Sequence, residues 1–536
     1  MKENHHDDTH APHIRYVPCK RPYKNNTCCL PFMYYYYLLL LSCFLIFDRS
    51  AGMATSPQNI NVAIIGAGAS GLAAARVLSR TFENAKIKVL EKQPGPSISE
   101  HDDDGDDFCS SDTIPGVGGV WHHIPDSKDR PMYKNLRTNL PREIMGYREK
   151  PWGRWENTKK IPFGAKDGAS FVTHREVHSY LSDYTREFNL SQFMHFNCEV
   201  TQVKILDEHE EWSKINVTWT DEGQQLEETF DMVCVCNGHY FVPVRMSSID
   251  FKPFSGKVIH AIEYDDPISF AGRNVLCIGA RASGTDLARE ISMHANKVYL
   301  SDSTCPPLLV DEKPKSLGNV TLVPRTVRVD VSSVQFAGDS EACIVEDIDT
   351  IVVCTGYDYD FPFINEKSNL GSSWRCVAGE RRVAPLYGQL WHARYPSLSF
   401  LGLPHSVLPF PFFELQAEAI ASQYGLLPTL EDRLRFAKDD AESGGPKDPG
   451  RLQDTHYLGN FQWDYYRKMS KLAGNYNEAM EIFISQSKAI YDHSNMDRKG
   501  AFPGGPDEYR QTMYTRDDVN VKFEAKSDML EACVEA

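Results

Sequence analysis

Two glycine-rich turns are the parts of this sequence whose residue types and spacing most directly indicate chemistry. The first turn fits the pattern G-x-G-x-x-G of a dinucleotide-binding site. In such a turn the first glycine allows a tight bend, the second lets the backbone approach a pyrophosphate, and the third lets helix and strand pack closely. We therefore expect phosphate contacts from Gly66, Ala67, Gly68, Ala69, Ser70 and Gly71.

The sequence on both sides of this turn supports dinucleotide binding. The β-branched run 62–65 predicts a buried parallel strand, and the alanine-rich stretch 72–78 predicts a helix whose N-terminus faces the phosphates. The next expected strand, 86–90, is followed directly by Glu91, which lies 20 residues beyond Gly71. A carboxylate at that position can bind the ribose hydroxyls of an adenosine.

A second turn of the same kind follows the expected strand 274–278. Its middle glycine is replaced by an arginine, whose guanidinium can pair with a phosphate. The next strand, 297–300, leads to Ser301 and then to Asp302, which would repel a 2′-phosphate. We expect a nicotinamide dinucleotide here, with NADPH and NADH both open, bound by Gly279, Ala280, Arg281, Ala282, Ser283, Gly284 and Ser301.

Two such turns, 213 residues apart (279 − 66), predict a protein that binds FAD first and a nicotinamide dinucleotide second. The expected fold class is α/β, with two doubly wound Rossmann-like domains and the NADP domain inserted into the FAD domain. The expected boundaries are a leader at 1–57, the FAD domain at 58–240 and 346–432, the NADP domain at 241–345, and a C-terminal helical extension at 433–536. In that extension we expect partly helical structure over 465–491 and a polar loop over 501–510.

The leader contains an uncharged, strongly apolar run at 30–47, preceded by Lys20, Arg21 and Lys24. Its length is near the roughly 17–20 residues that cross a bilayer. One interpretation is an anchor in the endoplasmic reticulum membrane with a cytoplasmic N-terminus. The second is a signal peptide cleaved near the small residues 50–52, and the third is a cytoplasmic protein that starts at Met53.

The composition excludes several classes of protein. Hydrophobic residues make up 41% of the 536 residues, which argues against a collagen, a disordered chain or a multi-span membrane protein. The net charge of −16 gives no general attraction to nucleic acid. No CxxC occurs among the 14 cysteines, which argues against a disulfide reductase. We expect no metal site, because the adjacent His122 and His123 point apart and the acidic run 100–112 fits no calcium loop.

Further motifs, in consistent order, resemble those of flavin-containing monooxygenases. They are FSGKVIHAIEY (254–264), GGVW (118–121), YKNLRTNLPREIMGY (133–147), VCNGHY (235–240), CTGY (354–357) and FELQ (413–416). The resemblance runs from about residue 61 to about residue 425 and is strongest to the plant type known as glucosinolate S-oxygenases. Two features depart from that pattern: the acidic insertion before Gly118 is longer, and Asp302 stands where the plant proteins carry an arginine.

The resemblance implies an FAD- and NADPH-dependent monooxygenase. Such an enzyme inserts one atom of O₂ into a small soft nucleophile, a thioether sulfur or an amine nitrogen, through a C(4a)-hydroperoxyflavin. Three alternatives stay open: a Baeyer–Villiger monooxygenase, for which Tyr264 is the wrong residue, an uncoupled NADPH oxidase, and an idle flavin-binding protein.

The resemblance also implies roles for single residues. Asn139 would act in catalysis by hydrogen bonding near the flavin and NADP⁺; the alternative is that it caps a helix starting in NLPRE. Cofactor contacts are also implied for Gly119, Trp121, Thr138 and Gln416. Trp121 could instead be an ordinary core aromatic, and Gln416 could lie on a plain helix surface.

Overall fold

The computed structural model describes residues 59–96, 113–125, 127–152, 169–372, 374–445, 448–449, 451–516 and 521–525. They belong to one compact unit, Pro57–Ala536. The leader 1–57 and the acidic run 100–112 lie outside the described residues, so the interpretations of the leader stay predictions. Within the described residues, no helix is both long and apolar enough to span a bilayer.

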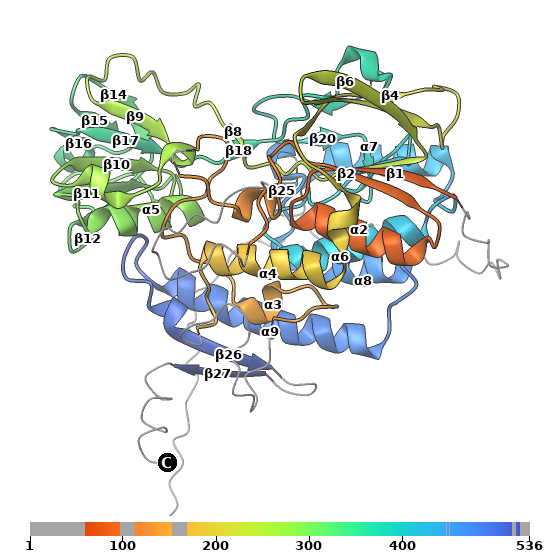
Figure 1. Cartoon of the computed structure of the whole chain (residues 1–536). Coiled ribbons are helices and arrows are strands. Elements are labelled where there is room, and N and C mark those ends of the chain that lie inside the picture. Colours follow the sequence, from red (N-terminus) through yellow and green to blue (C-terminus); the bar gives the residue numbers. More distant parts are fainter. Residues whose placement is uncertain are drawn as a thin grey trace, which may run out of the picture. The chain divides into compact units, whose positions relative to one another are not determined.

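The first sheet combines strands from two distant parts of the chain (Figure 1). Its seven strands run in the order β21-β22-β23-β7-β1-β2-β3, and β23, β7, β1, β2 and β3 are parallel. Their bounds are β1 Asn61–Ile65, β2 Lys86–Leu90, β3 Met194–His195, β7 Met232–Val235, β21 Leu386–Tyr387, β22 Trp391–His392 and β23 Leu398–Phe400. The last three strands follow the second glycine turn in the sequence. The second sheet is therefore inserted between the two parts of the chain that form the first sheet. We call each sheet, with the helices packed on it, a unit.

The second sheet has six strands in the order β12-β13-β11-β10-β17-β9, all parallel except β12. Their bounds are β9 Lys257–His260, β10 Asn274–Ile278, β11 Lys297–Ser301, β12 Lys315–Leu317, β13 Val320–Val323 and β17 Thr350–Val353. Two sheets of mainly parallel strands, one nested within the chain of the other, confirm the expected fold class. However, β17 lies beyond the expected boundary at 345/346. It pairs in parallel with β10 and therefore belongs to the second sheet.

The two chain crossings between the sheets pair with each other. β8 (Val242–Pro243) leads out of the first unit, β18 (Tyr357–Asp358) leads back, and the two form an antiparallel pair. The second crossing therefore falls about ten residues later than the sequence suggested.

The other elements surround these sheets. The helices are α2 Ala69–Thr81, α3 Arg142–Met145, α4 His174–Glu187, α5 Ala282–Ser292, α6 Pro409–Ser422, α7 Leu430–Ser443, α8 Gln462–Leu472 and α9 Glu478–Gly500. The small antiparallel sheets contain β4 Cys198–Ile205, β5 Ile215–Asp221 and β6 Gln224–Phe230; β14 Thr326–Val329, β15 Val334–Phe336 and β16 Ile344–Val345; β19 Arg375–Cys376 and β20 Val383–Ala384; β24 Gly444–Gly445 and β25 Asp448–Pro449; and β26 Thr512–Arg516 and β27 Val521–Ala525.

The C-terminal extension is helical in part over 465–491, as expected, and the helical residues belong to two helices, α8 and α9. Gly474 takes a left-handed conformation (φ +71°) just after α8, and the Asn477 side chain accepts a hydrogen bond from the Met480 N–H at the start of α9. A left-handed glycine ends a helix and an asparagine cap starts one, so two helices form. The chain then ends its described part in the β26–β27 hairpin, which the sequence did not indicate.

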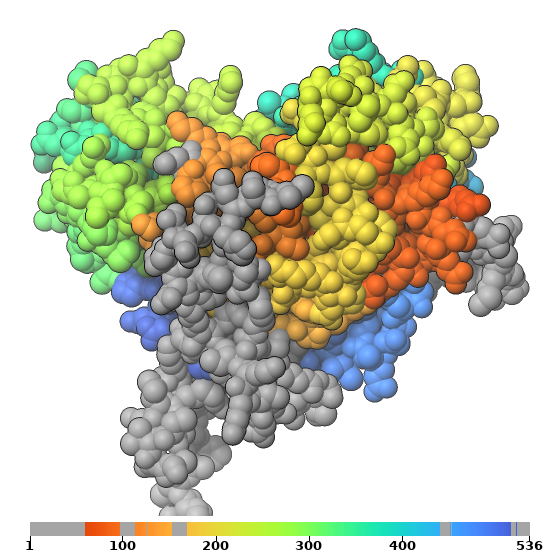
Figure 2. All heavy atoms as spheres, viewed as in Figure 1, coloured from red at the N-terminus to blue at the C-terminus, as the bar shows by residue number. Residues whose placement is uncertain are grey.

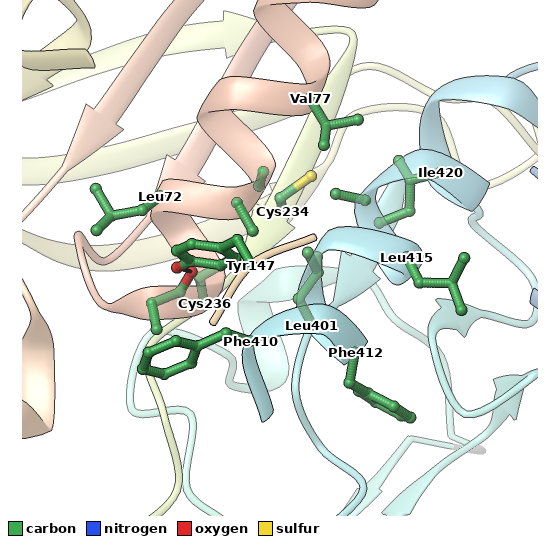
Figure 3. Close-up of a cluster of buried hydrophobic side chains, with 14 of the residues drawn as sticks. Leu72, Val77, Tyr147, Cys234, Cys236, Leu401, Phe410, Phe412, Leu415 and Ile420 are labelled. Carbon is green, nitrogen blue, oxygen red and sulfur yellow. Dashed lines mark hydrogen bonds between the residues drawn. The ribbon is translucent and has the colours of Figure 1, made fainter. Parts of the chain in front are cut away.

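The core beneath the first glycine turn joins α2 to α6 (Figure 3). Figure 3 shows Tyr147 between these helices, close to Phe410, and the two rings are 5.2 Å apart. The Tyr147 hydroxyl donates a 2.6 Å hydrogen bond to the Ala69 carbonyl in the first turn of α2. Apolar packing and one buried hydrogen bond thus fix the helix that follows the glycine turn.

Leu415 on α6 is fully buried in this core, so Leu415→Ala should leave a cavity. We expect the substitution to destabilise the protein by about 2–5 kcal/mol and to lower its melting temperature in a thermal scan. The matched control is Leu426→Ala, because Leu426 is 52% exposed. A Leu415→Ala variant that melts with the Leu426→Ala variant would contradict this packing.

Candidate functional site

The first glycine turn is packed tightly at two of its three glycines. Gly66 has a φ of +104°, and a Cβ on it would lie 2.7 Å from the Cys236 carbonyl oxygen at the end of β7. A Cβ on Gly71 would lie 1.9 Å from the Gly66 carbonyl oxygen. A Cβ on Gly68 would meet nothing of the protein closer than 3.6 Å. The free space at Gly68 therefore fits the close approach of a ligand.

The N-terminus of α2 offers its amide groups to an anion. The helix has no side-chain cap at Gly68 and no acidic residue in its first turn. Uncapped N–H groups and the helix dipole together favour a phosphate at this end. These features fit the pyrophosphate of a dinucleotide at the first turn.

Glu91 lies directly after β2 and is almost fully buried. One carboxylate oxygen accepts a 2.8 Å hydrogen bond from the Ala67 N–H, and the other accepts a 2.9 Å bond from the Gln93 N–H. Burial raises the pKa of Glu91, although both N–H donors oppose that rise. Glu91 thus braces the glycine turn, a role the sequence did not indicate, and each oxygen keeps a lone pair for a ribose hydroxyl.

The second turn repeats this design. Gly279 has a φ of +106°, and its Cβ would lie 2.8 Å from the Cys354 carbonyl oxygen at the end of β17. A Cβ on Gly284 would lie 1.7 Å from the Gly279 carbonyl oxygen. Arg281, at the middle position, has φ −85° and ψ −168°, which is extended backbone like that of Gly68. The missing glycine is therefore tolerated, and the exposed Arg281 stands at the uncapped start of α5.

Ser301 and Asp302 at the end of β11 are already engaged within the protein. The Ser301 hydroxyl donates to the Pro324 carbonyl and accepts from the N–H and hydroxyl of Thr326. The Asp302 carboxylate accepts hydrogen bonds from the N–H (2.8 Å) and hydroxyl (2.9 Å) of Thr304. A cofactor contact of Ser301 stays a prediction, and the Thr304 donors offset part of the charge of Asp302.

Residues 133–139, which we call the junction segment, touch both units. Tyr133 and Leu136 pack against the hydrophobic cluster of the second sheet. The Lys134 N–H donates to Asp265, which also receives a 2.7 Å bond from the His123 ring. On the other side, Thr138 exchanges hydrogen bonds of 2.8 and 3.1 Å with the backbone of Val172. The segment is therefore held from both sides.

Asn139 follows directly and is half-buried. The alternative that it caps the next helix is wrong, because α3 begins at Arg142 and its N-cap is Pro141, with no side-chain cap. No hydrogen bond to the Asn139 side chain is present within the described residues. The amide is thus placed at the junction of both units with its donor and acceptor free for a ligand.

Gly119 and Trp121 lie against the first turn. The Gly118 N–H donates to the Ala67 carbonyl, and a Cβ on Gly119 would lie 2.9 Å from the Gly68 Cα. Trp121 is half-buried and packs its edge on Phe410, with ring centroids 6.3 Å apart. The two sequence-distant motifs are therefore brought together around Gly68.

Gln416 does not lie on a plain helix surface, because it is fully buried in α6. Its Oε1 accepts a 2.9 Å hydrogen bond from the Gly402 N–H, and its Nε2 donates a 2.9 Å bond to the Tyr465 hydroxyl. These contacts order the loop before α6. A contact of its remaining amide hydrogen with a cofactor stays a prediction.

Buried polar atoms without a hydrogen-bond partner occur near the paired crossings. Within the described residues they include His239 Nε2, Thr355 Oγ1 and the Tyr357 hydroxyl. Burial lowers the pKa of His239 to about 3, so the ring is neutral at physiological pH. Unpaired buried polar atoms are costly, and a bound polar ligand is a standard way to satisfy them. They therefore fit a second dinucleotide beside the second turn.

Several known proteins are similar to this chain in sequence and in fold. A family described as flavin-binding monooxygenase-like matches residues 59–306. The chain is 34% identical to flavin-containing monooxygenase FMO GS-OX5 of Arabidopsis thaliana, across 78% of this chain and 86% of that protein. The solved S-allyl-L-cysteine S-oxygenase of Allium sativum is 29% identical, covers 90% of this chain and 98% of its own, and superposes with a TM-score of 0.68.

A cyclohexanone monooxygenase shares the fold at 16% identity, with a TM-score of 0.51 over 78% of this chain and 98% of its own. At that identity the likeness concerns the fold alone. The identity to the Arabidopsis protein over most of both chains is decisive, together with the two glycine turns and the junction segment between them. The chain belongs to the flavin-containing monooxygenase family and is a flavin-dependent monooxygenase.

Proposed function

We propose that this enzyme transfers one oxygen atom from O₂ to the sulfur of a small thioether, with NADPH as the reductant. The observation that carries the proposal is the position of Asn139, whose unengaged amide follows a segment held by both dinucleotide-binding units. The choice of sulfur over nitrogen is supported by the relatives, which are named as GS-OX enzymes and as an S-allyl-L-cysteine S-oxygenase.

We assign FAD to the first unit and NADPH to the second. The FAD unit would contain residues 58–240 and the return segment from about 357 to 432, and the NADPH unit the residues between them. The extension 433–536 would complete the FAD unit, because Trp463, Tyr466 and Ile484 lie in the same hydrophobic core as α2 and α6. This assignment moves the second boundary beyond β17, whose carbonyl end packs on Gly279.

The chain's own residues would bind and orient the two cofactors. Electron transfer from NADPH to O₂ is the chemistry that bound FAD supplies. The turn Gly66–Gly71 and the α2 N-terminus would hold its pyrophosphate, and Glu91 would accept bonds from its ribose. Contacts with the flavin ring are assigned to Gly119, Trp121, Thr138 and Gln416.

Asn139 would donate a hydrogen bond from its amide at the place where the two cofactors meet. A donor fixed before the reaction begins costs no reorganisation during it, and it also keeps water from taking the same position. Arg281 would pair with the 2′-phosphate of NADPH, since it is exposed at the start of α5 and Asp302 is turned to Thr304.

The reaction itself is tested by a product assay. We expect the purified chain to be yellow and to oxidise NADPH faster when a thioether is present, with a stoichiometric sulfoxide found by mass spectrometry. Parallel assays offer a tertiary amine and a cyclic ketone. NADPH oxidation that yields only hydrogen peroxide would contradict oxygen transfer, and an ester from the ketone without sulfoxide would favour the Baeyer–Villiger alternative.

The phosphate contact of Arg281 predicts a cofactor-selective defect. We expect Arg281→Ala to raise the KM for NADPH about tenfold or more while changing the KM for NADH less, because only NADPH carries the 2′-phosphate. Steady-state kinetics with both cofactors measure this difference. Equal increases in the two KM values would show that Arg281 does not bind that phosphate.

The amide of Asn139 predicts a defect in oxygen transfer. We expect Asn139→Ala to retain FAD but to lower sulfoxide formation about 100-fold, the size of effect seen when one preorganised donor is lost. Asn460→Ala is the control, since Asn460 is also an asparagine and is exposed outside the junction segment. Sulfoxide yields per NADPH that agree between the two variants would contradict the role of Asn139.

A further inference from the structure

The C-terminal segment 501–511 packs on both dinucleotide-binding units. Phe502 joins the hydrophobic cluster of the second sheet, and a Cβ on Gly504 would lie 3.2 Å from Ala288 on α5. Tyr509 instead belongs to the core of the first unit, 5.4 Å from Phe171. Figure 1 shows the blue chain after α9 passing beside the green α5, and Figure 2 shows blue atoms directly beneath the green surface.

Arg510 makes hydrogen bonds to both units from one guanidinium. Its Nε donates a 2.9 Å hydrogen bond to the carbonyl oxygen of Thr138, the residue before Asn139. Its two terminal nitrogens donate to the Asp286 carboxylate on α5 at 2.8 and 3.3 Å. A 3.2 Å bond to Asp507 in its own segment and a 3.4 Å bond to the Arg137 carbonyl complete the set. The same side chain therefore ties the junction segment to the helix that follows the second glycine turn.

The arginine at the centre of this contact is almost inaccessible to water. Arg510 is only 3% exposed. Burial disfavours the charged form of Asp286, but Arg510 and Arg289 outweigh that effect and hold the pKa of Asp286 below its ordinary value. A buried ion pair is strongly disturbed when one partner is removed, because the other charge is left unpaired. The arrangement is thus suited to transmit a displacement of α5 to Thr138.

We propose that Arg510 is a positioning residue that sets the place of Asn139 relative to bound NADP⁺. The proposal rests on the assignment of NADPH to the second unit and of Asn139 to oxygen transfer. The planar guanidinium can serve both sides at once, whereas a lysine ammonium on the same stem has one donor centre and cannot span them. A positive charge alone is therefore not enough to hold Thr138 and Asp286 together. Several donor nitrogens in one plane are needed.

The test compares Arg510→Lys and Asp286→Asn with Arg433→Lys. Arg433 is a matched control, since it is also a buried arginine, 1% exposed, with bonds to Glu211 and the Ala393 carbonyl but none to α5. Hydrogen–deuterium exchange of peptides covering 135–145 and 282–292 reports the contact directly, without turnover. NADP⁺ titration and the ratio of hydrogen peroxide to NADPH consumed report its effect on the site.

We expect both test variants to exchange faster in the two peptides. We also expect them to bind NADP⁺ about five- to tenfold more weakly and to release a larger share of electrons as hydrogen peroxide. The Arg433→Lys control should lower the melting temperature without these changes. Test variants that match the control in exchange and NADP⁺ affinity would overturn the proposal.

The outcomes separate this proposal from the proposed reaction. If the unmodified chain makes no sulfoxide, the reaction fails, while exchange and NADP⁺ affinity still decide the role of Arg510. If Arg510→Lys does not fold, Asp286→Asn decides, because it keeps the shape and one acceptor oxygen of the Asp286 side chain. Faster exchange with unchanged NADP⁺ affinity and an unchanged peroxide ratio would show a structural contact only and would also overturn the proposal.

Discussion

The junction segment 133–139 has to be held by two dinucleotide-binding units that are built from different parts of the chain. Tyr133 and Leu136 are fixed by apolar contact with the second sheet, and Thr138 by backbone hydrogen bonds on the side of the first. A loop with only one of these supports would follow one unit and not the other. The proposed role of Asn139 at two cofactors depends on both supports, which act on the residues just before it.

The two glycine turns could be predicted because their requirements are local. Gly66 and Gly279 bend the chain with positive φ, and a Cβ on Gly71 or Gly284 would overlap a carbonyl oxygen of its own turn. Such constraints leave a mark within six residues of sequence. The structure adds why Arg281 is accepted in the second turn: the middle position is extended and needs space, not a glycine conformation. The strands and helices beside each turn followed from the same local pattern.

The parts of the site that depend on distant contacts could not be predicted. Nothing near Arg510 in sequence indicates Thr138 or Asp286, which lie 372 and 224 residues away. The composition of 501–510 predicted a polar loop, but this segment packs on both units. Gln416 could be read as a surface residue because helical spacing does not show that the Gly402 N–H faces it. The helix-cap interpretation of Asn139 failed because Pro141 shifts the helix start to Arg142.

The most direct test of this account is an experimental structure of the full chain with FAD and NADP⁺ bound. The account places the Asn139 amide within hydrogen-bond distance, about 3.5 Å or less, of one or both cofactors, with Arg510 still bridging Thr138 and Asp286. An Asn139 amide turned away from both cofactors, with the FAD and NADP⁺ rings meeting elsewhere, would contradict it.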